Sequence, residues 1–368
     1  MNTEPRRCTR CILPESFPGI SFNVDGVCSI CQEYDKEWGH INEDYFKKSE
    51  KKLKRILNNA KKLKRRYDCL VPLSGGKDST YVLYLCKRVY NLNVLAVNFN
   101  NGYQTDEAFQ NVKQAANILD VDLIIYKPRW ETTKKLTRGF LKATGEGCTP
   151  CNVGVGLTIS RIAQLEKIPL IMNGISPRSD ERSPRTIYAS GGEYFMKVVK
   201  RNALLKDIRS TIYEDQVRQL SFWHRFTRKI TRMTLMDQGV FRFLPKNMFV
   251  RNSIPLVIPK YVEWNEDTIF NTIRNELNWK ESEVGKEHTD CMLNPLKCYL
   301  RHQRWGFGSK TQKYSALIRD GQMDREEALK LITDEGDVPK NLEKVKKVLE
   351  IDTEEFESIK QQYHGDYI

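Results

Sequence analysis

The chain has 368 residues, of which 40% are hydrophobic and 29% are charged, and its formal net charge is +13 at pH 7. This length suffices for about two domains with buried cores. Met1–Arg10 lacks the apolar segment of a secretory signal and no run approaches ~18 apolar residues, which argues against secretion or membrane insertion and predicts a cytoplasmic protein. Its ten cysteines, mostly paired, fit metal binding in a reducing compartment better than a disulfide scaffold.

Two CxxC pairs near the N-terminus form the first motif, with Cys8, Cys11, Cys28 and Cys31 as candidate ligands. Their spacing matches a four-thiolate zinc ribbon, and Asp25-Gly26 in the gap predicts a hairpin turn. A segment of ~35 residues buries little core, so Zn²⁺ would supply its folding energy. We expect a structural zinc ribbon over residues 1–40; four free thiols or two disulfides are the alternative.

A strongly basic segment follows the cysteines. Residues 46–67 carry eleven basic residues and one acid, and Leu53, Ile56, Leu57 and Leu63 form a helical apolar stripe. Residues 41–67 are therefore predicted to be a basic helical linker. Its charge suits nucleic acid or an acidic partner, or is simply a solvated helix face.

The most specific motif is Ser74-Gly75-Gly76-Lys77-Asp78-Ser79, between an apolar strand at 70–73 and a helical pattern. Two glycines allow the backbone to approach an anion, and the helix start points its free amides there. Lys77 and the serine hydroxyls can bind phosphate, and Asp78 can hold Mg²⁺ or the loop itself. The motif resembles the SGGxDS loop of the ATP pyrophosphatase (PP-loop) superfamily, which grips the pyrophosphate of ATP; a turn without a ligand is the alternative.

Strands and helices then alternate. Strands are predicted at 93–99, 121–126 and 168–172, with helices at 106–119 and 157–165. This order predicts an α/β fold with a doubly wound parallel sheet, as the resemblance to PP-loop enzymes also implies. Ligands of such sheets lie beyond the carboxyl ends of the strands, so Asn98 and Gly174 join the loop as candidate ATP-binding residues.

A further CxxC pair, Cys148 and Cys151, lies after a glycine-containing loop and before the helix predicted at 157–165. It could be a redox pair, two metal ligands or a structural pair. In PP-loop enzymes that thiolate tRNA, a similar pair and a distant cysteine hold an iron-sulfur cluster, and Cys291 or Cys298 could be that third ligand here. We do not favour the cluster.

The remaining boundaries follow from composition. The PP-loop domain is predicted over residues 68–200, a helical insertion over 201–250, completion of the α/β domain with a helical region over 251–345, and a tail over 346–368. The basic segment 197–232 falls largely in the insertion.

The C-terminal segments narrow the resemblance. Together with the zinc-ribbon start, the SGGKDS loop and the CTPCNVG segment, the HTDC and WGF…YSALIRDGQMDREEAL segments resemble the N-acetyl sugar amidotransferases of bacterial surface-polysaccharide and nonulosonic acid biosynthesis. The resemblance spans Cys8 to about Leu331. It implies adenylation of an N-acetyl carbonyl oxygen on a sugar or nucleotide sugar by ATP, and substitution by ammonia to form an acetamidino group. Catalytic roles fall on Ser74, Lys77 and Asp78, and His288 and Asp290 are candidate substrate residues.

The chain has no glutaminase signature. The family resemblance implies a separate glutaminase subunit and a cyclase-like barrel subunit that supply ammonia. The alternative function is a tRNA-thiolating enzyme, which the zinc ribbon, the basic helix and the CxxC suit. Against it, no double arginine follows Cys151 and no second ribbon closes the C-terminus. A zinc-dependent nucleic-acid-binding protein would leave the SGGKDS loop unexplained.

Overall fold

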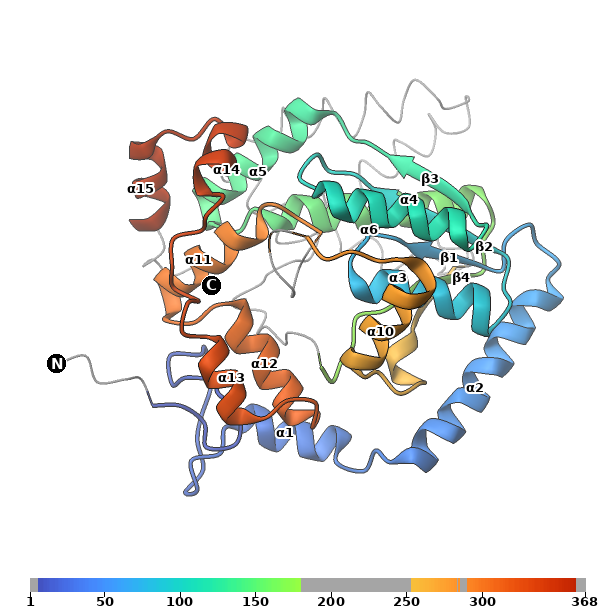
Figure 1. The fold of residues 1–368 in the computed structure, drawn as a ribbon, viewed down its shortest axis with the longest axis horizontal. Coiled ribbons are helices and arrows are strands. Elements are labelled where there is room, and N and C mark those ends of the chain that lie inside the picture. Colours follow the sequence, from blue (N-terminus) through green and yellow to red (C-terminus); the bar gives the residue numbers. More distant parts are fainter. Residues whose placement is uncertain (1–5, 180–252, 283, 285–289, 362–368) are drawn as a thin grey trace, which may run out of the picture.

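The α/β part of the protein is built on a five-stranded parallel sheet, whose labelled strands lie on the right in Figure 1. The computed structural model describes residues 6–179, 253–282, 284 and 290–361. The strand order is β3-β2-β1-β4-β5, and Leu70 of β1 pairs with Leu95 on one side and Ile171 on the other. This confirms the predicted α/β fold with a parallel sheet. The strands are β1 (Cys69–Pro72), β2 (Val94–Phe99), β3 (Asp122–Tyr126), β4 (Leu170–Asn173) and β5 (Ile254–Val257).

Helices cover both faces of this sheet. Val71 and Ala96 face a core built with α3 (Lys77–Tyr84), α4 (Asp106–Ile118) and α10 (Glu266–Leu277), and a π-helical turn over Leu85–Val89 extends α3. Leu70 and Val97 face α6 (Cys148–Leu165), on which α5 (Trp130–Thr144) packs. The chain runs from β1 outward to β3 and then returns to β4 on the other side of β1. Such a reversal of strand order opens a crevice at the carboxyl ends of the two strands, here β1 and β4.

The N-terminal segment is a small ribbon followed by two helices. An antiparallel bridge joins Phe22 to Cys28 across a turn in which Gly26 has a φ of +77°, as the Asp25-Gly26 turn predicted. Helix α1 (Ser29–Trp38) begins directly after Cys28, and α2 (Glu43–Lys62) follows. Leu53 and Leu57 of α2 pack into the core beneath the sheet, so the basic segment is an amphipathic helix as predicted.

The first part of the C-terminal helical region packs against the N-terminal ribbon (Figure 1). Ile12 of the ribbon packs on Leu317 and Ala328, and the Phe17 ring packs at a tilt against that of Phe307, with a centroid distance of 5.2 Å. The later helices instead contact α5. In chain order these helices are α11 (Asn294–Trp305), α12 (Ser309–Arg319), α13 (Arg325–Leu331), α14 (Leu342–Leu349) and α15 (Thr353–Gln361).

The helical insertion at 201–250 lies outside the described residues, and the domain boundaries remain predictions. The helix expected at 157–165 begins earlier, at Cys148, so the CxxC pair occupies its first turn and does not precede it. Among the described helices, none combines the length and apolarity needed to span a membrane.

Candidate active site

The loop Ser74–Ser79 joins β1 to α3 and is held by its own side chains. The Ser79 hydroxyl accepts from the Ser74 amide at 3.2 Å and lies 3.1 Å from the Ser74 hydroxyl. The Thr80 hydroxyl donates to the Gly76 carbonyl oxygen at 2.9 Å. Within the described part of the chain, no side chain caps the start of α3. Its first backbone amides therefore remain available to an anion at the end of β1.

The two glycines have different roles. Gly75 has a φ of +85°, and a Cβ there would lie 2.1 Å from the Ala108 carbonyl oxygen, so only glycine fits. The Gly75 carbonyl oxygen also accepts from the indole Nε1 of Trp279 at 2.8 Å. A Cβ on Gly76 would meet Ser74 Oγ at 3.4 Å and Asp290 Oδ2 at 3.5 Å, which are ordinary contacts. Gly75 shapes the loop, whereas Gly76 keeps the space above it open.

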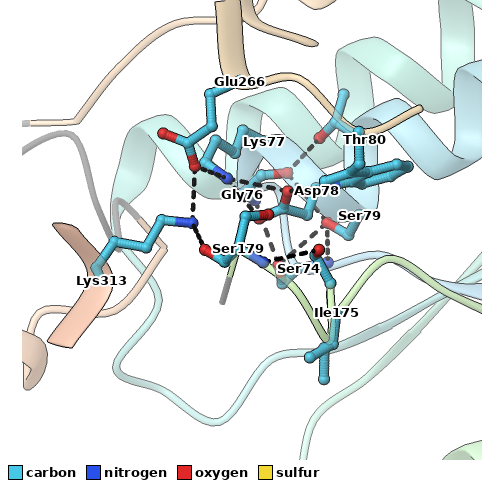
Figure 2. A network of polar contacts seen from close by, with 12 residues as sticks. Ser74, Gly76, Lys77, Asp78, Ser79, Thr80, Ile175, Ser179, Glu266 and Lys313 are labelled. Carbon is cyan, nitrogen blue, oxygen red and sulfur yellow. Dashed lines mark hydrogen bonds and ion pairs between the residues drawn. The ribbon is translucent and has the colours of Figure 1, made fainter. Parts of the chain in front are cut away.

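Lys77 is buried. Its side chain is 8% exposed, and its ammonium lies 2.8 Å from Asp78 Oδ2 and 2.9 Å from Glu266 Oε1 (Figure 2). Burial disfavours its charge, but Asp78 and Glu266 more than compensate and raise the pKa of Lys77. The sequence suggested a lysine in a polar loop facing phosphate; here its ammonium is held by two carboxylates.

Glu266 links this loop to the C-terminal helices. Its Oε1 is also 2.8 Å from the Lys313 ammonium, so two lysines share one carboxylate oxygen (Figure 2). Lys313 in turn donates to the Ser179 carbonyl oxygen at 2.8 Å. Burial opposes the charge of Glu266, but Lys313 and Lys77 lower its pKa to about 2. If Lys77 moved away, Glu266 would keep Lys313 as a partner.

A cavity of about 590 Å³ opens beside the loop, at the carboxyl ends of β1, β2 and β4. This is the crevice that the strand reversal between β1 and β4 creates. The predicted residues that line it are Ser74, Asp78, Ser79, Cys148, Cys151, Gly174, Asp290 and Cys291. The structure thus brings together loop, glycine and cysteine candidates from four separate segments.

Other candidates lie elsewhere. Asn98 is buried, and its side-chain amide donates to the Leu73 carbonyl oxygen at 2.8 Å, so it fixes the backbone directly after β1. Neither Asn98 nor Lys77 is among the residues lining the cavity. His288 lies outside the described residues, and Cys298 is half-buried on α11. The catalytic and ATP-binding roles assigned from sequence therefore remain predictions.

The three cavity cysteines are all affected by burial. Burial raises the pKa of Cys148 and of Cys291, and it raises that of Cys151 to about 12. Cys151 Sγ accepts from the Asn101 side-chain amide at 3.1 Å. Burial therefore disfavours the thiolate form of these cysteines when no metal ion is bound.

The four N-terminal cysteines form a candidate metal centre. Their sulfurs all lie within 4.8 Å of one another, with Cys8 and Cys31 at 3.9 Å and Cys11 and Cys28 at 3.8 Å. Tetrahedral ligands ~2.3 Å from a zinc ion would be about 3.8 Å apart. Backbone amides donate to Cys8 Sγ and Cys28 Sγ, as suits thiolates. Among the described residues, this is the one such group of His, Cys, Asp and Glu, and it fits structural Zn²⁺.

The loop also fits Mg²⁺. The Asp290 carboxylate lies over Gly76, and Asp78 lines the same cavity. A carboxylate placed over an anion-binding loop would repel phosphate unless a cation lay between them. Oxygen ligands from Asp78, Asp290 and the serine hydroxyls have the chemistry that Mg²⁺ prefers.

Sequence patterns did not reveal several cavity residues. Tyr103, Glu146, Lys297 and Arg301 come from two loops and one helix and meet only through the fold. Arg301 Nε donates to Glu146 Oε1 at 2.8 Å and its Nη1 to the Ser309 hydroxyl at 3.1 Å. The basic residues of the segment 294–305 were the one available signal, since four of its twelve residues are Lys, Arg or His.

Comparisons with known proteins bear on this site. A family model described as "LPS biosynthesis protein WbpG-like, C-terminal domain" matches residues 261–368. An uncharacterized protein of Methanocaldococcus jannaschii is 23% identical over 331 residues, covering 86% of this chain and 95% of its own length.

Two solved structures are similar in part. The U34-tRNA thiolase NcsA from Methanococcus maripaludis with its [4Fe-4S] cluster is 15% identical with a TM-score of 0.36, covering 95% of this chain and 89% of its own. The NH3-dependent NAD synthetase from Campylobacter jejuni is 13% identical with a TM-score of 0.28, covering 63% and 93%. The parallel sheet and its Ser74–Ser79 loop themselves establish the α/β fold of this chain.

Proposed function

We propose that the protein is an ATP-dependent amidotransferase that converts an N-acetyl group of a sugar or nucleotide sugar into an acetamidino group. The observation that carries the proposal is the loop Ser74–Ser79, which opens with the start of α3 into a cavity large enough for ATP and part of a second substrate. Such a loop suits a reaction in which pyrophosphate leaves.

The reaction divides into two steps. The amide carbonyl oxygen attacks the α-phosphorus of ATP, the bond to the bridging oxygen breaks, and pyrophosphate leaves with its electron pair. The resulting O-adenylyl imidate has a good leaving group on carbon. Ammonia then adds to that carbon, AMP departs, and the acetamidine remains after proton loss.

The residues of the loop would act mainly by position and charge. Free amides at the start of α3 and the hydroxyls of Ser74 and Ser79 would hold the leaving pyrophosphate. Mg²⁺, bound by Asp78 and Asp290, would neutralise charge on the phosphates. To reach the pyrophosphate, the Lys77 ammonium would have to break its ion pair with Glu266. Glu266 would still be paired with Lys313, which lowers the free-energy cost of that movement.

The sugar part of the proposal rests on the C-terminal region. The match to the C-terminal domain of WbpG-like LPS biosynthesis proteins covers α10 to α15. Lys297 and Arg301 of α11 line the cavity, so this region contributes to the site itself. It supports a role in surface-polysaccharide biosynthesis, such as that of lipopolysaccharide O-antigen, capsule or flagellin glycan.

Ammonia would come from partners. We propose a glutaminase subunit and a cyclase-like barrel subunit, as the sequence resemblance implies. Burial raises the pKa of the three cavity thiols, which disfavours their use as nucleophiles for hydrolysing glutamine.

The test is a reaction with ATP, Mg²⁺, ammonium and a panel of N-acetylated sugars and nucleotide sugars. The expected products are AMP, pyrophosphate and a sugar about one mass unit lighter, because NH replaces O. A double variant, Ser74→Ala with Ser79→Ala, is the matched control, since it removes two hydroxyls that bond within the loop. Absence of a lighter product with every sugar, while AMP accumulates with tRNA, would contradict the proposal.

Thiolation of tRNA is the competing reaction, because Cys148, Cys151 and Cys291 line the cavity. It would use the same adenylation on a base carbonyl, with sulfur as the nucleophile. Iron and acid-labile sulfide in anaerobically purified protein, together with co-purifying tRNA, would favour it. Colourless, iron-free protein that makes the acetamidino sugar would exclude it.

A further inference from the structure

The turn that follows α12 lies within the YSALIRDGQMDREEAL segment but outside the cavity. Its residues are Asp320, Gly321 and Gln322, and none of these three is among the residues that line the cavity. Gly321 has a φ of +73°, and the Gln322 backbone amide donates to the Leu317 carbonyl oxygen at 2.9 Å. The turn is thus fixed to the end of α12. Any effect of this turn on the site must pass through other residues.

The side chain of Gln322 binds the backbone at the start of α10. Its Oε1 accepts from the Glu266 amide at 2.9 Å, and its Nε2 donates to the Trp264 carbonyl oxygen at 2.9 Å. One carboxamide therefore holds the backbone on both sides of Asn265, the residue that caps α10. A carboxamide can accept and donate at once, whereas an ionised carboxylate only accepts and an aliphatic side chain does neither.

The same short stretch of backbone carries two side chains that reach the phosphate loop. The indole Nε1 of Trp264, a residue that is 2% exposed, donates to Asp78 Oδ1 at 3.2 Å. The Glu266 carboxylate pairs with the Lys77 ammonium at 2.9 Å (Figure 2). The two charged residues of the loop are consequently held from residues 264–266. A shift of this backbone would displace both contacts together.

Asp320 fixes the orientation of the Gln322 side chain. Gln322 Nε2 donates to Asp320 Oδ2 at 2.6 Å. The other carboxylate oxygen, Oδ1, accepts from Arg178 Nη1 at 3.2 Å and from the Tyr34 hydroxyl. The side chains of Asp320 and Arg178 are 4% and 8% exposed, so these bonds lie away from water, where hydrogen bonds are stronger. Because Tyr34 belongs to α1 and Arg178 follows β4, the ribbon and the sheet both support the turn.

We propose that Gln322, oriented by Asp320, is a positioning residue for ATP binding. By holding the backbone of residues 264–266, it keeps Lys77 and Asp78 in place at the phosphate loop. The inference rests on the part of the proposed function in which that loop binds ATP, and it does not depend on the sugar. It assigns this turn of the C-terminal segment to the adenylation half of the reaction.

Nucleotide binding without turnover tests the role. The full chain is titrated calorimetrically with Mg²⁺ and α,β-methylene-ATP, in which a carbon atom replaces the bridging oxygen and prevents adenylation. Gln322→Met keeps the length of the side chain and removes its bonds to the backbone of α10, so it should bind the nucleotide about tenfold or more weakly. Gln32→Met is the matched control, because it removes a glutamine bond to the Val27 carbonyl oxygen in the ribbon, and it should bind like the wild type. Circular dichroism and melting temperature verify that both variants are folded during the titration.

A double variant separates positioning from a purely structural role. Trp264→Phe removes the N–H group that binds Asp78 but keeps the backbone carbonyl oxygen that binds Gln322. If Gln322 acts through this contact, the factor by which Gln322→Met weakens nucleotide binding should be about threefold or more smaller in the Trp264→Phe background than in the wild type. A role confined to general stability would lower the melting temperature and leave the same factor in both backgrounds.

Two results would overturn the inference. One is a folded Gln322→Met protein that binds the nucleotide like the wild type. The other is an equal effect of Gln322→Met with and without Trp264→Phe. Because no turnover is needed, a protein that binds the nucleotide in a Gln322-dependent way but forms no acetamidine would refute the reaction and retain the positioning role.

Discussion

The guanidinium of Arg325 donates to the backbone carbonyl oxygen of Cys8 at 3.2 Å. The same side chain donates to the Cys11 carbonyl oxygen, also at 3.2 Å. Both acceptors belong to the first CxxC turn, so α13 holds the backbone that shapes the metal site. The ribbon is consequently part of the folded body and not a tethered appendage.

Loss of a ribbon cysteine should therefore affect more than the metal. Cys8→Ser or Cys28→Ser should lose one equivalent of zinc and lower the melting temperature, because three thiolates no longer organise the ribbon beneath α12 and α13. Metal analysis and calorimetry measure both effects. Cys298→Ser, outside the ribbon, should keep its zinc; equal zinc in all three variants would contradict the assignment.

The two loop glycines should respond differently to the same substitution. Gly75→Ala should destabilise the protein by about 3 kcal/mol or more, because its Cβ would collide with the Ala108 carbonyl oxygen at a positive φ. Gly76→Ala should fold normally and bind ATP more weakly, since its methyl group enters the space above the loop. Denaturant unfolding and nucleotide titration give the comparison; equal stability of the two variants would contradict it.

Glu266 should stabilise the protein only above acidic pH. Its pKa is lowered to about 2 from the ordinary value of 4.5, so its stabilisation is complete above ~5 and disappears as pH falls toward 2. Glu266→Gln should cost about 2–3 kcal/mol at pH 7, and the difference from wild type should shrink below pH 5. Urea unfolding between pH 7 and pH 3 tests this; a difference that does not vary with pH would exclude the mechanism.

A pair of variants separates two roles for Lys77. If Lys77 reaches the pyrophosphate, Lys77→Met should lose about 10²-fold or more in AMP formation, whereas Glu266→Gln should retain most activity. If Lys77 only holds the loop through Glu266, both variants should lose activity similarly. Asp78→Asn should also lose about 10²-fold through Mg²⁺ or the loop. Wild-type AMP formation by Lys77→Met would remove it from the mechanism.

The nitrogen source gives a fifth test. The purified chain should use free ammonium and fail with glutamine until a glutaminase partner is added. The ammonium-dependent rate should rise toward pH ~9, as NH₃ replaces unreactive NH₄⁺. Glutamine-dependent product from this chain alone would require a hydrolytic nucleophile, and Cys148, Cys151, Cys291 and Cys298 would be the first to substitute.

The parts of the site predicted from sequence are those encoded within short segments. The loop Ser74–Ser79 and the four ribbon cysteines have local spacing rules, and β1, β2 and β4 are apolar runs that end at turn residues. The burial of Lys77 was not predicted because its partner Glu266, and Lys313 that shares this carboxylate, lie far along the chain. Partners that meet only through tertiary structure leave no periodic signal.

The surroundings of Cys148 were also not predictable from local sequence patterns. Glycines at 145 and 147 suggested a loop around Cys148, yet Gly145, with a φ of +61°, ends α5 and the next helix begins almost at once. Tyr103 and Lys297 were missed because an aromatic residue after a strand and a lysine on a helix usually indicate core and surface. The cavity that they line forms from six segments of the chain at once.

The position of α10 limits how the C-terminal region can be inherited. The similarity to WbpG-like proteins begins at residue 261, but Ile269, Ile273 and Leu277 of α10 pack into the core against β1 and α3. A gene segment coding for residues 261–368 would therefore include α10, a helix that packs on a sheet whose other strands and helices are mostly encoded in the first half of the chain. Such a segment cannot move between proteins as an interchangeable cassette, and lineages that exchange it must carry compatible changes in the first half of the chain.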